Sequence, residues 1–196
     1  EEYEFSFYRL SDTIPVYVPC ESLDAYKTNE KWAYFTNIQC IAEEQYNKIR
    51  YTSSDGNIVT PYDTTAFGAN IISNTYENGE GIITFDGPVT QIGDWAFLDC
   101  QSLSSIIIPN SVSSIGNETF SSCTSLTTIK IPNSVTSIGV DVFRSGGNVS
   151  LNSIVVEEGN TMYDSRDNCN AIVETATNTL LYACNTTIIP NTVTTI

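Results

Sequence analysis

The sequence predicts an α/β repeat solenoid that is β-rich, with short strands and few short helices. Three observations predict this fold class. Part of the chain repeats with a step of 23 residues, as Ile92, Ile115 and Ile138 show (115−92 and 138−115). Apolar residues alternate within each repeat as they do in a short strand. An N-terminal segment at residues 21–35 has helical apolar spacing and is expected to form a helical, cap-like element before the repeats.

The repeat is most regular over two consecutive units. Residues 92–114 read IGDWAFLDCQSLSSIIIPNSVSS, and residues 115–137 read IGNETFSSCTSLTTIKIPNSVTS. A third unit begins at Ile138, but its strand residues come two positions late, so we expect a small insertion around Gly146 and Gly147. After a longer insertion, the pattern resumes as IIPNTVTTI at residues 188–196.

The order of residues within one unit predicts its local structure. Leu103, Ile106 and Ile108 have the spacing of a strand that points these side chains inward. Pro109 has no backbone N–H and is therefore expected to end the strand. Phe120 is expected to fill the core from the turn that follows. One unit buries too little apolar surface to offset its loss of backbone entropy, so the units are expected to stack.

The motif L-x-x-I-x-I-P-N-S-V-x-x-I-G-x-x-x-F-x-x-C resembles the BspA-type leucine-rich repeat family. The resemblance covers about residues 82–156 and part of residues 187–196, and it implies a leucine-rich-repeat right-handed superhelix. Residues 16–38 are similar to segments that close such arrays. Residues 51–76 are similar to segments that open them, and residues 170–184 to insertions within them.

The resemblance implies three parts of the chain. Residues 1–45 are expected to be a closing or cap segment with one helix, and residues 46–90 an opening segment. Residues 91–196 are expected to be leucine-rich repeats of period 23, with an insertion at about residues 157–186. The polar stretch AEEQYNKIR, at residues 42–50, is the expected junction between the first two parts.

Within the cap segment, we expect one amphipathic helix over residues 21–35. Leu23, Tyr26, Trp32 and Ala33 are expected to form its packed side. Such a helix could cover the open end of a repeat array and its unpaired strand edge.

The composition argues against several classes of function. Twenty-three acidic and 8 basic residues give a net charge of −15, which disfavours nucleic acid and anionic lipid as partners. Histidine, the commonest general base and metal ligand, is absent from the sequence. No run of 18 apolar residues exists, so no membrane insertion is expected. We therefore expect no catalysis, no cofactor and no metal, with a calcium site at residues 164–168 as a minor alternative.

No pair of the six cysteines has the spacing C-x-x-C of zinc ribbons and thioredoxin-like motifs. Cys100 and Cys123 occupy equivalent places in successive units, within disulfide reach. Two buried thiols are the favoured interpretation of this pair. Two further pairings stay open as closures of short loops: Cys20 with Cys40, and Cys169 with Cys184.

The strand pattern also predicts an exposed sheet face that is a possible partner-binding face. Its residues are the outward positions of three strands, and most of them are Ser, Thr or Asn. The simpler alternative is a plain solvated face, because aromatic and Arg anchors are few. The candidate residues are Ser104, Ser105, Ile107, Thr127, Thr128, Lys130, Asn152, Ser153 and Val155.

The predicted function follows mainly from the resemblance. Members of the family are known from surface and secreted proteins of oral and gut anaerobic bacteria and some protists. They are usually described as adhesion or protein-interaction proteins. The resemblance therefore implies an extracellular or cell-surface protein, its signal peptide removed, that binds a protein or glycan ligand. A structural stalk or spacer that presents another domain is the alternative.

Overall fold

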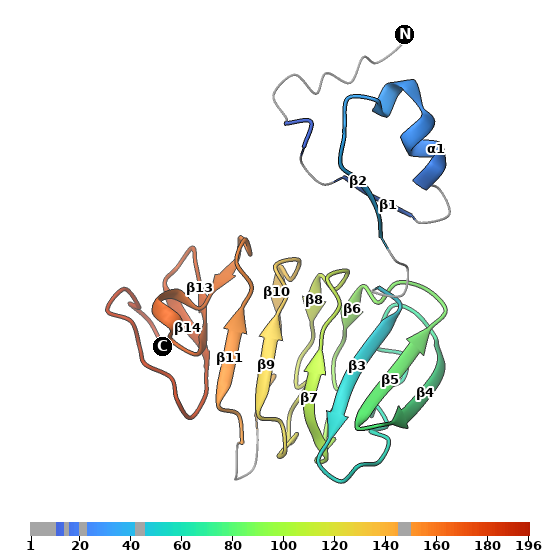
Figure 1. The fold of residues 1–196 in the computed structure, drawn as a ribbon. Helices are drawn as coiled ribbons and strands as arrows, with labels where there is room; N and C mark the ends of the chain where they lie inside the picture. Colours follow the sequence, from blue (N-terminus) through green and yellow to red (C-terminus); the bar gives the residue numbers. More distant parts are fainter. Residues whose placement is uncertain (1–10, 14–15, 20–22, 42–45, 145–149) are drawn as a thin grey trace. The chain divides into compact units, whose positions relative to one another are not determined.

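The structure is a computed structural model that describes residues 11–13, 16–19, 23–41, 46–144 and 150–196. The chain divides into two compact units, Glu1–Gln45 and Tyr46–Ile196 (Figure 1). The expected pairing of Cys20 with Cys40 and the expected small insertion at Gly146 and Gly147 lie outside the described residues.

The first unit is built around a parallel pair of strands. Strand β1 (Val16–Pro19) pairs with β2 (Ile38–Ile41), and the helix α1 (Leu23–Thr28) and the 3-10 turn η2 (Glu30–Trp32) connect them. The core of this unit consists of Val18, Phe35 and Ile38, with Leu23, Tyr26 and Trp32 packed against it.

The helix expected over residues 21–35 is wrong in length, because α1 ends at Thr28 and a 3-10 turn follows. Asn29 interrupts the helix with an extended backbone, and its side chain accepts a hydrogen bond from the Lys31 N–H at 2.9 Å. Ala33 was expected on the packed side but is exposed. The other three expected residues do pack in the core of this unit.

A mixed six-stranded sheet dominates the second unit, in the order β11-β9-β7-β3-β5-β4 (Figure 1). Successive repeats supply β7, β9 and β11, which pair in parallel. Strand β3 is antiparallel to both β7 and β5, and β4 is antiparallel to β5, so the strands of residues 46–90 belong to the same sheet as those of the repeats. The bounds are β3 (Lys48–Ser53), β4 (Ile71–Glu77), β5 (Glu80–Phe85), β7 (Leu103–Ile107), β9 (Thr128–Ile131) and β11 (Ser153–Val156).

The second sheet of this unit is entirely parallel, and it contains the short strands β6 (Gln91–Ile92), β8 (Ser114–Ile115) and β10 (Ser137–Ile138). Ile92, Ile115 and Ile138 are direct neighbours in this sheet. The first two units therefore each contribute one strand to each sheet, and the step of 23 residues is a structural unit.

The core of the second unit contains the side chains that the repeat pattern predicts. Leu103, Ile106 and Ile108 are buried, as are their counterparts in the next unit. Aromatic rings form a stack through the same core. The ring centroids of Phe97 and Phe120 are 5.7 Å apart, those of Phe120 and Phe143 are 6.0 Å apart, and both pairs are nearly parallel. Phe67 and Tyr182 extend this row of rings beyond Phe97 and Phe143, respectively, through edge-to-face contacts.

The motif L-x-x-I places two polar residues between inward-facing side chains, where a regular strand would have one. A β-bulge accommodates the extra residue. Thr52 pairs with Ser105, whereas the next residue, Ser53, pairs with Leu103. Ser104 is therefore the extra residue, and the alternation of buried and exposed side chains resumes after it.

The expected insertion forms a small antiparallel sheet of β12 (Tyr163–Asp164), β13 (Ala171–Glu174) and β14 (Thr179–Ala183), with the 3-10 turn η4 (Arg166–Asn168) between β12 and β13. Asn160 fastens this sheet to the repeats. Its Nδ2 donates to the carbonyls of Pro132 and Val135 at 3.0 and 2.9 Å.

The segment at residues 188–196 matches the repeat in sequence but differs from it in burial. Ile196 is 85% exposed, whereas the equivalent Ile115 is buried. Ile189 is also exposed, although its counterpart Ile108 is buried. Within the described part of the chain, no further unit packs on this segment, so these isoleucines lack the cover that the inner units give one another.

The cysteines whose side chains are described are all free thiols. Buried thiols are therefore confirmed for Cys100 and Cys123, and the loop closure between Cys169 and Cys184 is not formed. The thiol of Cys100 donates to the carbonyl of Thr60 at 3.4 Å. Burial raises the pKa of both Cys100 and Cys123, and that of Cys100 reaches about 11.

Candidate interaction surface

The outward face of the six-stranded sheet carries a row of long side chains. Arg50 pairs with Ile82 on one side and with Ile107 on the other, and Val155 pairs with Lys130. The parallel pairing of β7 with β9 brings Ile107 beside Lys130, so the row is continuous over five strands. Ile107 is 62% exposed, and Val155 is also exposed. We call Ile82, Arg50, Ile107, Lys130 and Val155 the aliphatic–basic row.

A second row runs beside the first and consists of hydroxyl side chains. Thr52, Ser105, Thr128 and Ser153 are neighbours in the register of β3, β7, β9 and β11. The Oγ1 of Thr52 lies 2.6 Å from the Oγ of Ser105. This hydroxyl row offers hydrogen-bond donors and acceptors along four strands.

Alternation within the strands explains how the basic residues reach this face. Ile49 and Tyr51 of β3 are buried, so Lys48, Arg50 and Thr52 point to the opposite side. Lys130 reaches the same face from β9, between two buried isoleucines. The face therefore gathers basic side chains in a chain whose net charge is −15.

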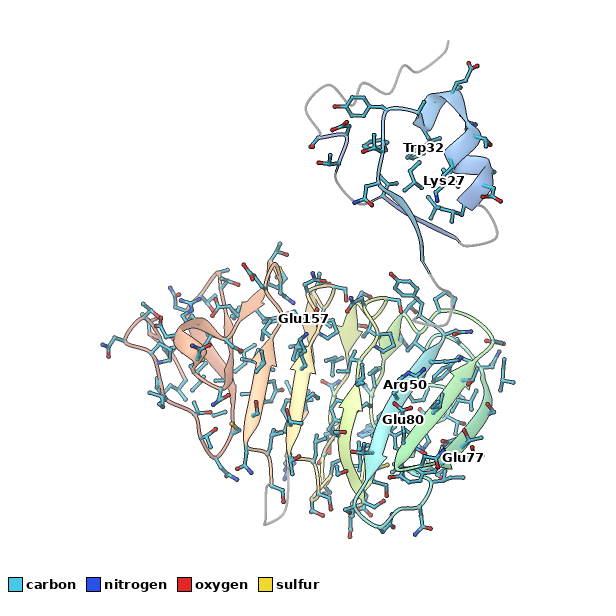
Figure 2. The ribbon with its side chains drawn as sticks, viewed as in Figure 1. Lys27, Trp32, Arg50, Glu77, Glu80 and Glu157 are labelled. Carbon is cyan, nitrogen blue, oxygen red and sulfur yellow. The ribbon has the colours of Figure 1, made fainter. Side chains whose placement is uncertain are left out.

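Arg50 and Lys130 each form an ion pair with a carboxylate. The Arg50 guanidinium lies 2.8 Å from the Glu80 carboxylate, and the two side chains meet on the sheet (Figure 2). The Lys130 ammonium lies 2.6 Å from the Glu157 carboxylate. At least one side chain of each pair is well exposed, so water screens the pairs and each stabilises the fold by about 1 kcal/mol or less.

All nine residues predicted for the partner-binding face are at least partly exposed. Six of them fall in the two rows: Ser105, Ile107, Thr128, Lys130, Ser153 and Val155. The other three stand at the strand starts: Ser104 in the bulge, Thr127 before β9 and Asn152 before β11.

Sequence reasoning missed the part of the face that the opening segment supplies. Arg50 and Thr52 belong to β3, which has no counterpart in the 23-residue repeat, and Ile82 belongs to β5, which lies one step of 23 residues before β7. The available signal was the alternation in residues 48–52, KIRYT, which is typical of a strand with one buried face.

The acidic stretch at residues 164–168 has a structural use. Both carboxylate oxygens of Asp164 accept hydrogen bonds from Arg166, at 2.8 and 2.6 Å. Burial alone would raise the pKa of Asp164, but the hydrogen bonds and charge of Arg166 outweigh it and lower that pKa. No group of three or more His, Cys, Asp or Glu side chains among the described residues is placed to hold a metal ion.

Comparison with known families agrees with the repeat geometry. Six copies of the BspA type leucine rich repeat region match residues 46–173. This chain belongs to the BspA-type leucine-rich repeat family. The family match confirms the resemblance of the repeat motif, and it begins at residue 46, before the most regular repeats. As a leucine-rich repeat protein, the chain is strand-rich with few helices.

Two solved structures resemble parts of this leucine-rich repeat chain. A leucine rich cell surface protein from Faecalibacterium prausnitzii A2-165 is 31% identical, over 47% of this chain and 24% of that protein, with a TM-score of 0.40. The pneumococcal vaccine antigen PcpA is 24% identical, over 41% of this chain and 25% of that protein, with a TM-score of 0.32. The matched region is about a quarter of the length of either protein. A search among curated proteins finds no match.

Among the described residues, no helix has the length and apolar character that a membrane span requires.

Proposed function

We propose that this chain is part of an exported or cell-surface leucine-rich repeat protein that binds a partner protein through the outward face of its six-stranded sheet. The aliphatic–basic row is the observation that carries this proposal. Exposed Ile107 and Val155 alternate with Arg50 and Lys130 across neighbouring strands. These aliphatic side chains contribute nothing to the core of the unit, and a partner that covers them would gain about 25 cal/mol per Å² of apolar surface.

The chemistry of the face suits a protein more than a glycan. Arg50 and Lys130 can exchange their present carboxylate partners for those of a bound protein, which gives charge-assisted hydrogen bonds. The hydroxyl row supplies the polar contacts that border most protein interfaces. The two rows contain no aromatic ring on which a sugar could stack. Adhesion to a host or bacterial protein is the finer function that we propose.

We further infer that the repeats form a right-handed solenoid, with residues 1–45 as a closing segment and residues 46–90 as an opening segment of repeat arrays. In a solenoid, each unit packs only on its neighbours. The continuous row of ring contacts from Phe67 to Tyr182 supports a second candidate function, a rigid spacer that presents another domain.

The test is a binding screen with the 196-residue chain on immobilised fibronectin, laminin and collagen, and on a glycan array. One variant carries Ile107→Glu and Val155→Glu, which places two carboxylates in the aliphatic–basic row. The matched control carries Val140→Glu and Leu181→Glu, which adds the same charge at exposed apolar positions outside the six-stranded sheet. Circular dichroism verifies that both variants fold.

We expect saturable binding to a matrix protein that the row variant loses and the control retains. Binding that both variants retain would remove the sheet face from the interaction. Binding to glycans alone would overturn the choice of a protein partner. The absence of any binding would favour the spacer.

A further inference from the structure

An open groove lies where the loop after β3 meets the turn before β7, and its volume is about 500 Å³. Backbone hydrogen bonds join the two walls. The Ser54 N–H donates to the carbonyl of Ser102 at 2.8 Å, and the Tyr62 N–H donates to that of Ala96 at 2.9 Å. The groove is therefore formed before any ligand arrives, which lowers the entropic cost of binding.

The β3 loop is also anchored from behind. The Tyr51 hydroxyl accepts a hydrogen bond from the Val59 N–H at 3.1 Å, and the Asn74 Nδ2 donates to the carbonyl of Val59 at 2.9 Å. Tyr51 and Val59 are buried, so these hydrogen bonds fix the loop backbone at Val59, midway along this wall of the groove. The side chains on either side of Val59 are left facing solvent.

The lining of the groove combines exposed apolar surface with carboxylates. Tyr62 is 66% exposed, and Ile58 and Leu98 provide further apolar surface. Asp55 stands in one wall and Asp99 in the other, and no Lys or Arg lines the groove. An exposed aromatic ring beside carboxylates is an arrangement that attracts a cation with an apolar stem.

The repeat itself supplies an internal comparison. Most positions that fill the core keep their residue from the first unit to the second, as Phe97 and Phe120 do. The groove positions change: Leu98, Asp99 and Gln101 are replaced 23 residues later by Ser121, Ser122 and Thr124. The second unit forms the same turn without these side chains, so the fold of the turn does not require them.

We propose that this groove binds a basic peptide segment of a partner protein. The aliphatic stem of a Lys or Arg lies along Tyr62 and Ile58, and its charged head donates hydrogen bonds to the carboxylates of Asp55 and Asp99. This site is separate from the sheet face and does not depend on the function proposed for that face.

The charge of the molecule supports a cationic ligand. A net charge of −15 attracts basic segments over long range and raises their association rate. Hydrogen bonds from the side chain of Ser53 and the backbone of Asn57 lower the pKa of Asp55, so its carboxylate is ionised at neutral pH. The Asp99 carboxylate is held by the Gln101 side chain, whose Nε2 donates to it at 2.8 Å.

The test uses fluorescence anisotropy with a labelled peptide of alternating Arg and Gly, at physiological salt. The groove variant carries Asp55→Asn and Asp99→Asn. The control carries Asp141→Asn and Glu158→Gln, two exposed positions outside the groove, so both variants change the net charge equally. Asp99 and Asp141 both have a left-handed backbone that Asn also adopts, which matches the strain of the two substitutions. Tyr62→Ala and its control, Ile72→Ala, test the apolar contribution.

We expect the groove variant to bind the peptide about tenfold more weakly, and Tyr62→Ala several-fold more weakly, with both controls within about twofold of the unmodified chain. An equal loss in the groove variant and its charge-matched control would show that attraction is diffuse and would overturn the proposal. Failure of the unmodified chain to bind the peptide saturably would also overturn it. A third result would overturn the proposal: glycan-array binding that Tyr62→Ala abolishes, together with no peptide binding. The groove would then be a sugar site.

Discussion

Removal of the Phe120 ring should cost this protein a large part of its stability. The Phe120 side chain is 2% exposed, and it stacks on Phe97 and Phe143 at 5.7 and 6.0 Å. Truncating a buried Phe to Ala costs about 3–5 kcal/mol. Each aromatic pair adds about 0.5–1.5 kcal/mol beyond burial, and two pairs are lost here. We therefore expect Phe120→Ala to lower the free energy of unfolding by about 4–5 kcal/mol, at the upper end of that range.

Two further variants separate the contributions. Phe143→Ala also removes a ring with two aromatic neighbours, but Phe143 is only half-buried, so we expect a smaller cost of about 2–3 kcal/mol. Phe120→Leu retains most of the apolar volume and loses the stacking, so we expect a cost of about 1–2 kcal/mol.

The assay is urea denaturation of the 196-residue chain, followed by far-ultraviolet circular dichroism, with thermal melts in parallel. A loss of 4 kcal/mol should lower the Tm by about 8–16 °C in a chain of this size. A cost for Phe120→Ala below about 2 kcal/mol, or a larger cost for Phe143→Ala, would refute the reasoning. Either result would mean that the stack of rings does not set the stability of this core.

Four other outcomes follow from local contacts. Burial raises the pKa of Cys100 from 9.0 to about 11, so at pH 8 about 0.1% of it is thiolate instead of about 10%. Ellman's reagent should label the half-exposed Cys184 before Cys100, and Cys100 only on unfolding. Because the pKa of Cys100 is raised in the folded state, its neutral thiol contributes fully to the free energy of unfolding below pH 9.0. This contribution is lost as the pH rises through about 11, and urea titrations across this range would detect the loss. Gly116→Ala would place a Cβ 2.3 Å from the backbone nitrogen of Asp94 and should cost about 2–3 kcal/mol, whereas Gly87→Ala meets open space and should stay within about 0.5 kcal/mol by the same denaturation assay. Asn160→Ala removes the bonds that fasten the insertion and should speed amide hydrogen exchange in β12 and β13, with the exposed Asn191→Ala as a neutral control.

Sequence reasoning succeeded where the chain repeats itself. The inward positions of the strands and the row of phenylalanines follow from hydrophobic periodicity, because equivalent residues in stacked units have equivalent neighbours. The outward positions of β7, β9 and β11 follow from the same pattern.

The parts that escaped prediction depend on contacts that have no periodic signal. The antiparallel joining of β3 to β7 is a pairing between segments 50 residues apart (103−53), and local sequence does not specify it. Helix α1 ends early because the chain turns at Asn29, whose side chain caps the 3-10 turn that follows. The apolar spacing over residues 21–35 continues past Asn29 and therefore does not indicate this end. The groove beside Tyr62 requires the same long-range join, so it could not be located before the fold was known.

The antiparallel β3 has a consequence for how this protein can change over evolutionary time. It gives the parallel ladder of β7, β9 and β11 a fixed boundary on one side, so β7 has no free edge there. Duplication of a whole 23-residue unit between β7 and β11 would add one strand to each sheet, one ring to the core and one strip to the outward face. The face would widen in steps of about 4.8 Å, the spacing between strands. Each new strip could then diverge in its surface chemistry without disturbing the contacts that hold its neighbours.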